Sequence, residues 1–305
     1  MGMARWDPGH WAAYAGSTAG RSTASIFTGL KLNPALDPRL CGVRESRDSK
    51  ENPASNAIIV ALDVTGSMGM IADALARRGL GVLVQELLAR KPVSDPHIMA
   101  MGVGDAWCDS APLQVTQFEA DIRIARQLEQ IYLEHGGGCN DFESYNLPWY
   151  FAATRTAIDC FEKRGRKGYL FTVGDEPPPP LLLEGHVRRL MSSALQSDLS
   201  TPDLLAMVGR TYHVFHVIVE EGNYARHHLR DLTAKWTELL GQRVLRLADH
   251  TSLAEVVVSA IQVNEGVDVD TVARSWSGST ALVVKRAVSG LAMQHGAGSG
   301  GLVRL

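Results

Sequence analysis

Four short runs of mostly apolar residues, rich in branched and aromatic side chains, predict the strands of a buried sheet. They cover residues 57–62, 97–103, 169–173 and 212–219. In the first of them apolar residues fill consecutive positions instead of alternating with polar ones, which is typical of a strand covered on both faces. A fifth segment, 113–118, alternates apolar and polar residues and therefore predicts a half-buried strand.

Helical periodicity separates these strands. Between residues 70 and 90, leucine and isoleucine recur at a spacing of three to five, and Pro92 follows the end of the pattern. The same reasoning predicts helices over 121–134, 143–163, 184–196, 224–240 and 252–263, with another strand over 243–247. Strands that alternate with helices in this way predict an α/β fold, a doubly wound and mostly parallel sheet with helices on both faces.

The two ends of the chain differ from this central part. Residues 1–54 contain a small, polar stretch and a charged, turn-rich stretch without a clear period, so we expect an extended N-terminal arm. Trp6, Trp11 and Tyr14 are the exception, and we expect them to dock on the following domain. Residues 264–305 hold seven glycines and predict a loosely attached, Gly-rich C-terminal tail. Residues 55–263 are then the folded domain.

Composition narrows the classes of function. The 30 Lys and Arg against 33 Asp and Glu give a formal charge of −3, without the basic excess of a nucleic-acid binder. No window approaches the roughly 18 apolar residues of a membrane span, and the first residues lack the apolar core of a signal peptide. We therefore expect a cytoplasmic protein that binds neither nucleic acid nor a membrane.

The four cysteines predict neither a zinc module nor a secreted disulfide framework. Cys41, Cys108, Cys139 and Cys160 form no C-x-x-C pair, and their spacing fits no such pattern. Cys139 is a candidate reactive thiol because of the loop in which it lies, although burial as a small apolar residue is the commoner role of a free cysteine.

An open α/β sheet binds its ligands beyond the carboxyl ends of its strands. Three polar segments of this chain fall at such positions. They are 63–67, 136–141 and 174–176. In the first, Asp63, Thr65 and Ser67 place one carboxylate and two hydroxyls on the same side of a tight turn. Hard oxygen donors that converge in this way favour a small hard cation, Mg²⁺ above softer metals.

The sequence Asp63-x-Thr65-x-Ser67-x-Gly69 after an apolar strand resembles the metal-ion-dependent adhesion site (MIDAS) of von Willebrand factor A domains. The resemblance covers about two-thirds of the chain, residues 55–263. It implies a vWA/Rossmann-like fold and a Mg²⁺ ion held by these three side chains, with Mn²⁺ or Ca²⁺ as alternatives. By position it gives Asp175 the role of holding a metal-bound water.

The resemblance also implies a function. Members of this family bind protein partners, and the open position on the metal takes a carboxylate from the partner. An intracellular member commonly works in a multi-protein assembly, beside an AAA-type ATPase. The loop over 136–141 departs from the family, which usually has a threonine after a Gly-Gly pair. Asn140 or Asp141 would then supply the oxygen ligand, or water would fill the place.

Each of these residues also has a simpler interpretation. Thr65 and Ser67 would serve as helix N-caps, and Asn140 and Asp141 as turn formers. No phosphate-binding loop, nucleophile elbow or suitably placed histidine supports an enzyme. Two alternatives to a binding module stay open: a metal-dependent hydrolase that uses the same pocket, and a structural module whose metal site is vestigial.

Overall fold

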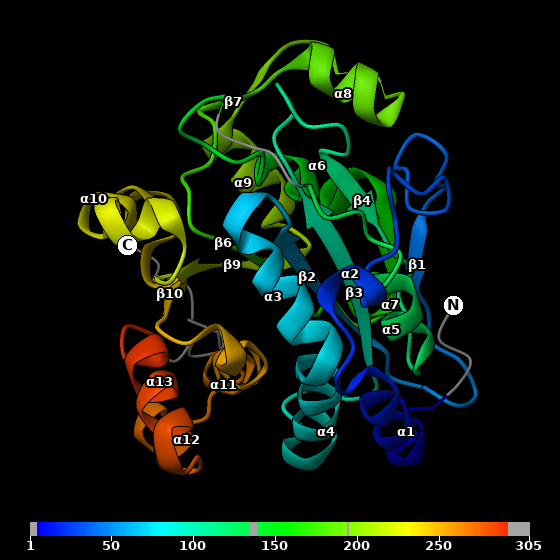
Figure 1. Cartoon of the computed structure of the whole chain (residues 1–305), viewed down its shortest axis with the longest axis vertical. Coiled ribbons are helices and arrows are strands. Elements are labelled where there is room, and N and C mark those ends of the chain that lie inside the picture. Colours follow the sequence, from blue (N-terminus) through cyan, green and yellow to red (C-terminus); the bar gives the residue numbers. More distant parts are fainter. Residues whose placement is uncertain (1–4, 135–138, 194, 292–305) are drawn as a thin grey trace, which may run out of the picture.

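The computed structural model describes residues 5–134, 139–193 and 195–291. Its centre is a six-stranded sheet in the order β10-β9-β6-β2-β3-β4 (Figure 1). The strands are β2 (Asn56–Asp63), β3 (Pro96–Val103), β4 (Leu113–Val115), β6 (Gly168–Gly174), β9 (Tyr212–Val219) and β10 (Val244–Leu247). Every neighbouring pair is parallel except β3 and β4. The expectation of an α/β fold with a mostly parallel sheet is confirmed.

Strand β2 explains why the core has two halves. All eight of its residues are buried. Because side chains alternate across a strand, Ile58, Val60 and Leu62 enter one apolar cluster, while Ala57, Ile59 and Ala61 enter the cluster on the opposite face. The continuous apolar run in the sequence is thus the signature of a strand covered on both sides.

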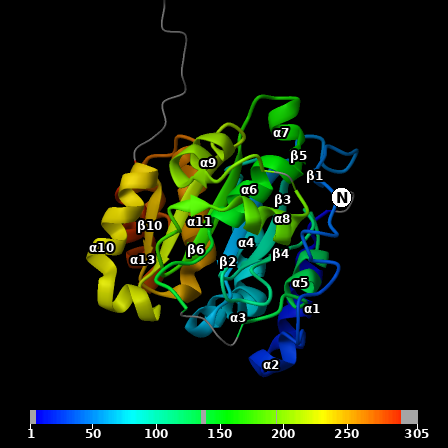
Figure 2. The same ribbon diagram turned by 90° about the horizontal axis from the view of Figure 1, so that it is seen from above.

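Helices cover both faces of the sheet (Figures 1 and 2). The cluster on one face is closed by α3 (Gly69–Ala74), the π-helical turn η2 (Leu75–Gly79), α4 (Leu80–Arg90), α5 (Arg123–Leu128) and α11 (Leu253–Asn264). The cluster on the other face is closed by α6 (Asn146–Arg155), α7 (Asp159–Glu162), α8 (Glu184–Met191), α9 (Thr201–Val208) and α10 (Asn223–Leu240).

Two small sheets and four short helical turns complete the domain. Strand β1 (Arg44–Ser46) pairs in parallel with β5 (Thr156–Ile158), and β7 (Leu181–Leu182) pairs antiparallel with β8 (Leu199–Ser200). Besides η2, the turns are η1 (Gly66–Met68), η3 (Gly241–Arg243) and η4 (His250–Ser252).

The helix predicted over 143–163 is interrupted in the structure. It divides into α6 and α7 with β5 between them, because β5 pairs with β1 from the N-terminal region. A pairing partner more than a hundred residues away leaves no local signal. Helix α9 was not predicted, although Ser200 caps it by accepting a hydrogen bond from the Asp203 amide and Pro202 lies in its first turn.

The N-terminal region is more structured than the expected arm. It contains α1 (Pro8–Thr18) and α2 (Thr23–Ile26). The predicted docking of its aromatic residues is observed: the Trp6 indole donates a hydrogen bond to the Pro96 carbonyl at 2.9 Å. Trp11 is 8% exposed, and the Tyr14 hydroxyl donates to Glu129.

The C-terminal region also differs from the expected loose tail. Helices α12 (Val269–Arg274) and α13 (Gly278–Val288) pack against α11, and Val284 and Val288 are fully buried. Residues 292–305 lie outside the described part. Among the described helices, none combines the length and apolar character needed to cross a membrane.

Candidate functional site

The predicted Asp-x-Thr turn lies at the carboxyl end of β2, in the centre of the sheet. Asp63 is the last residue of that strand and is 1% exposed. Its Oδ1 accepts hydrogen bonds from the Thr65 amide at 2.9 Å and the Thr65 hydroxyl at 2.7 Å. Thr65 precedes η1, but its side chain makes no cap bond to that turn. The structure thus brings the first two predicted ligands into contact.

Ser67 is the third predicted ligand. Its backbone lies in η1, in the turn between Asp63 and the start of α3. Its side chain falls outside the described part of the structure. Its role therefore stays a prediction.

A buried tyrosine completes the hydrogen bonding of Asp63. The Tyr145 hydroxyl donates to Asp63 Oδ2 at 3.1 Å, and its side chain is fully buried at the start of α6. Gly174 makes room for it, because a Cβ at that position would lie 1.8 Å from the Tyr145 oxygen. Sequence reasoning missed Tyr145, since nothing near it in the chain indicates that α6 delivers it to β2.

Asp175 follows β6, the neighbour of β2 in the sheet. Its Oδ2 accepts a hydrogen bond of 2.8 Å from the Tyr224 amide in the first turn of α10, a favourable place for a carboxylate. Gly222 permits this approach, since a Cβ there would lie 2.3 Å from the carboxylate. The charge of Asp175 also raises the pKa of Asp63, so the structure brings these two predicted residues together electrostatically.

Two further carboxylates lie in the same cluster. Glu176 belongs to the predicted polar segment 174–176 but was given no role, and Glu143 was not predicted. Burial raises the pKa of Asp63 to about 7 and that of Glu176 to about 8. Burial, followed by the charge of Asp63, also raises the pKa of Glu143. After burial, the largest influences on the pKa of Glu176 are the charges of four carboxylates, Asp63, Asp175, Asp105 and Asp141, and each of them raises it.

The chemistry of this set fits a hard divalent cation. Every donor is an oxygen, from carboxylates and the Thr65 hydroxyl, and hard oxygen donors are the ligands of Mg²⁺, Mn²⁺ and Ca²⁺. Burying several carboxylates together disfavours their ionisation, as the raised pKa values of Asp63 and Glu176 express. A cation that binds here restores the ionised form and offsets the repulsion.

The predicted loop 136–141 contacts Asp105, whereas the segments 63–67 and 174–176 hold Asp63 and Asp175. Residues 136–138 lie outside the described part. The Asn140 side chain donates to Asp105 at 2.5 Å and accepts from the Phe142 amide at 2.9 Å, the pattern of a turn former. Asp141 is exposed, and its charge contributes to the raised pKa of Glu176. The roles of Asn140 and Asp141 as ligands stay predictions.

Cys139 is not the free or buried thiol that we expected. It is exposed and forms a disulfide with Cys108, across a sequence separation of 31 residues. Cys41 and Cys160 are free and buried. The cysteine spacing did not predict this bridge because the two loops meet only in the folded chain.

Three aromatic rings, those of His216, Trp236 and Tyr145, pack against one another beside the carboxylate cluster. The His216 ring stacks on Trp236 with a centroid distance of 3.5 Å, and it lies 5.0 Å from the Tyr145 ring. The Trp236 indole donates to the Glu176 carbonyl at 3.1 Å. Burial holds the pKa of His216 well below its usual value, so this imidazole is neutral and serves as packing.

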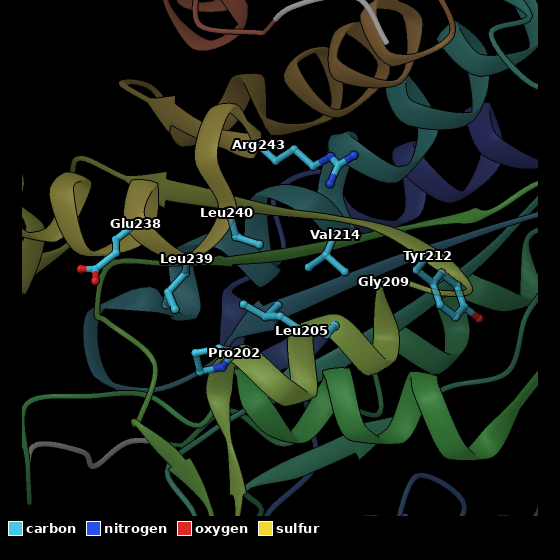
Figure 3. A pocket seen from close by; sticks show the side chains of 10 residues that line it. Pro202, Leu205, Gly209, Tyr212, Val214, Glu238, Leu239, Leu240 and Arg243 are labelled. Carbon is cyan, nitrogen blue, oxygen red and sulfur yellow. The ribbon is translucent and has the colours of Figure 1, made fainter. Parts of the chain in front are cut away.

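A separate cavity of about 400 Å³ is lined by residues of α9, β9, α10 and η3 (Figure 3). It lies at the end of the sheet opposite to Asp63. Tyr212, at the start of β9, lines it, whereas Asp63 ends the parallel strand β2. Its walls combine apolar side chains such as Leu205 and Val214 with the charged side chains of Glu238 and Arg243. It is therefore distinct from the carboxylate cluster.

No protein-family model matches the chain, and no curated protein matches it in sequence. Solved structures similar to it include the pilus adhesin SpaC from Lactobacillus rhamnosus GG in its open conformation, at 9% identity and a TM-score of 0.47. The alignment covers 72% of this chain and 31% of the adhesin.

Two other similar structures have comparable values. A von Willebrand factor type A protein from Catenulispora acidiphila has 14% identity and a TM-score of 0.38 over 70% of this chain and 43% of its own. Proximal thread matrix protein 1 from the mussel byssus has 8% identity and a TM-score of 0.41, over 69% and 48%. The chain thus spans less than half the length of each of these proteins. The α/β fold itself follows from the strand order and pairing described above.

Proposed function

We propose that this chain is a protein-interaction module that binds its partner through a divalent metal ion. The observation that carries the proposal is the hydrogen bond between Thr65 and the buried Asp63, at the carboxyl end of the central strand β2 and close to further carboxylates. Such a site concentrates negative charge, because the largest charge effects on the pKa of Glu176 come from four neighbouring carboxylates.

In this proposal Asp63, Thr65 and Ser67 bind Mg²⁺ directly, and Asp175 orients a water on the ion. The hydroxyl of Thr65 already donates its proton to Asp63, which leaves its lone pairs free for a cation. Neutral hydroxyl ligands leave part of the metal charge uncompensated, so an open position attracts a carboxylate from a partner protein. A cytoplasmic assembly that includes an AAA-type ATPase is one setting in which the module would act.

Calorimetric titration of the metal-free chain with Mg²⁺ and Mn²⁺ tests the first step. We expect one site in the wild type and its loss in Asp63→Asn, which keeps the size of the side chain but removes the charge. Asp270→Asn is the matched control, because Asp270 is exposed in α12, away from the sheet edge. Absence of binding to the wild type would contradict the proposal.

The second step is partner binding. Proteins captured on the immobilised wild type in Mg²⁺ would be released by a chelator and absent from the Asp63→Asn column. Binding of a captured partner should fall at least tenfold when the acidic residue that it presents is replaced by its amide. Recovery that is unchanged by chelator would count against metal-mediated binding, even if the metal itself binds.

A further inference from the structure

A second group of possible metal ligands lies beside the carboxylate cluster and is formed by Cys108, Cys139 and Asp105. Cys108 belongs to the β3–β4 connection and Cys139 to the segment before α6. Asp105 Oδ2 lies 3.1 Å from the sulfur of Cys108 and 3.2 Å from that of Cys139. The three ligand atoms lie within 4.8 Å of one another.

The position of Asp105 is unusual for a residue beside a disulfide. Its Oδ2 accepts a hydrogen bond from the Asn140 side chain and also faces both sulfurs. A disulfide has no S–H group, so neither sulfur can donate a hydrogen bond to this oxygen. Two thiols could each donate to that oxygen, and a cation could bind all three atoms at once. The carboxylate is therefore better matched to the reduced pair than to the disulfide.

Asp105 is also held in place independently of the sulfurs. It is 4% exposed, and its Oδ1 accepts a hydrogen bond of 3.0 Å from the Trp107 amide. The two cysteines are exposed, so a reductant and a metal ion can reach them from solvent. The fixed, buried carboxylate and the two accessible sulfurs together offer three ligands, and the site is open to solvent on the side of the sulfurs.

We propose that reduction of Cys108–Cys139 creates a binding site for one thiophilic divalent cation, Zn²⁺, with both thiolates and Asp105 as ligands and water as the fourth. A dithiol reductant passes two electrons and two protons to the disulfide, giving two thiols while the reductant becomes a disulfide. The cation then displaces one proton from each thiol into water as two Zn–S bonds form.

The ligand chemistry separates this site from the one proposed at Asp63. Thiolates select zinc over magnesium, whereas the donors around Asp63 are all oxygens. With Zn–S bonds of about 2.3 Å in a tetrahedron, the two sulfurs would move to about 3.8 Å apart. Both lie in connecting segments outside the central sheet, where such a shift is least restricted. The inference stands without the proposed function.

The test uses the full chain in two redox states. Protein is reduced with dithiothreitol, freed of it under argon, and titrated with Zn²⁺ by calorimetry and with Co²⁺ by absorption spectroscopy. We expect one equivalent of each metal, and a thiolate-to-cobalt charge-transfer band in the near ultraviolet. The oxidised wild type is the internal control, since it has the same sequence and fold and should show neither signal.

Variants assign the ligands. Cys108→Ser should abolish the charge-transfer band at one equivalent, and Asp105→Asn should weaken zinc binding at least tenfold. Cys160→Ala, which removes a buried cysteine outside the cluster, should bind zinc like the wild type. The described residues hold a rival cluster, formed by Glu221, Asp249 and His250, and His250→Ala tests it.

Three outcomes would overturn the inference. The first is equal zinc binding by reduced and oxidised wild type. The second is zinc binding that survives in Cys108→Ser but is lost in His250→Ala. The third is a cobalt complex of the reduced chain without any charge-transfer band, which would show that no thiolate binds the ion.

Discussion

The Tyr145 hydroxyl donates a hydrogen bond to Asp63 Oδ2 over 3.1 Å, and both side chains are buried. This bond joins the start of α6 to the end of β2, across 82 residues of sequence. It lowers the pKa of a carboxyl group that burial otherwise raises, and so favours the ionised form that a metal ion requires.

Tyr145→Phe removes that donor. We expect apparent Mg²⁺ affinity at pH 7 to fall roughly tenfold, because the pKa of Asp63 rises further and more of the carboxyl is protonated. The deficit should shrink at pH 8.5, where Asp63 ionises again. Titration calorimetry at both pH values measures this. Tyr150→Phe, on the same helix and with its hydroxyl near Ser193 instead of Asp63, should behave like the wild type.

The metal-free protein should be less stable at pH 8 than at pH 5. Asp63 has a pKa of about 7 in the fold against an ordinary value of 3.8, so between these values the folded state binds the additional proton. Stability therefore falls as pH rises through this window, by up to a few kcal/mol, and the loss is complete above about pH 7.

Glu176 acts in the same direction, because its pKa in the fold is about 8 against an ordinary 4.5. Thermal unfolding in a chelator at pH 5 and pH 8 measures the effect. Added Mg²⁺ should raise the melting temperature more at pH 8 than at pH 5, and Asp63→Asn should reduce both differences. A melting temperature that rises from pH 5 to pH 8 in chelator would contradict the prediction.

Gly174→Ala should destabilise the protein by about 1–3 kcal/mol. The added Cβ would lie 1.8 Å from the Tyr145 hydroxyl oxygen, so the ring must move and its bond to Asp63 is lost. Chemical denaturation measures the free energy of unfolding. Gly185→Ala is the control, because a Cβ there meets no heavy atom within 4 Å, and Ala favours the helix in which it lies.

Trp11→Ala should cost about 3 kcal/mol of unfolding free energy, since the indole is 8% exposed and lies against α4 beside Gly81. Trp107→Ala removes a side chain of the same size that is 41% exposed, and should cost less than half as much. Equal costs, or no cost at Trp11, would mean that the N-terminal region contributes little to the folded domain.

The order of strands and helices was predictable because it depends on local periodicity. Local periodicity predicts the buried positions of three such elements directly: β2, the amphipathic segment from α3 to α4, and β9. Predictions failed where a distant partner decides the local structure. Residues 156–158 continue a helical pattern, yet they form β5 because β1 offers a pairing edge.

Local sequence accounts for the β2 strand, the turn that follows it and the contact of Asp63 with Thr65. These depend on residues next to one another in the chain, and a short polar side chain reaches its own turn in almost any fold. The position of Asp175 one strand away also follows from parallel strands, whose carboxyl ends share one edge.

Other side chains meet Asp63 through the packing of elements that are distant in the sequence. Tyr145 and Glu143 reach the cluster because α6 packs on the sheet, and Cys108 reaches Cys139 because two loops converge beside Asp105. Such contacts depend on how apolar faces of distant elements fit together. Their pattern is therefore absent from any single stretch of sequence.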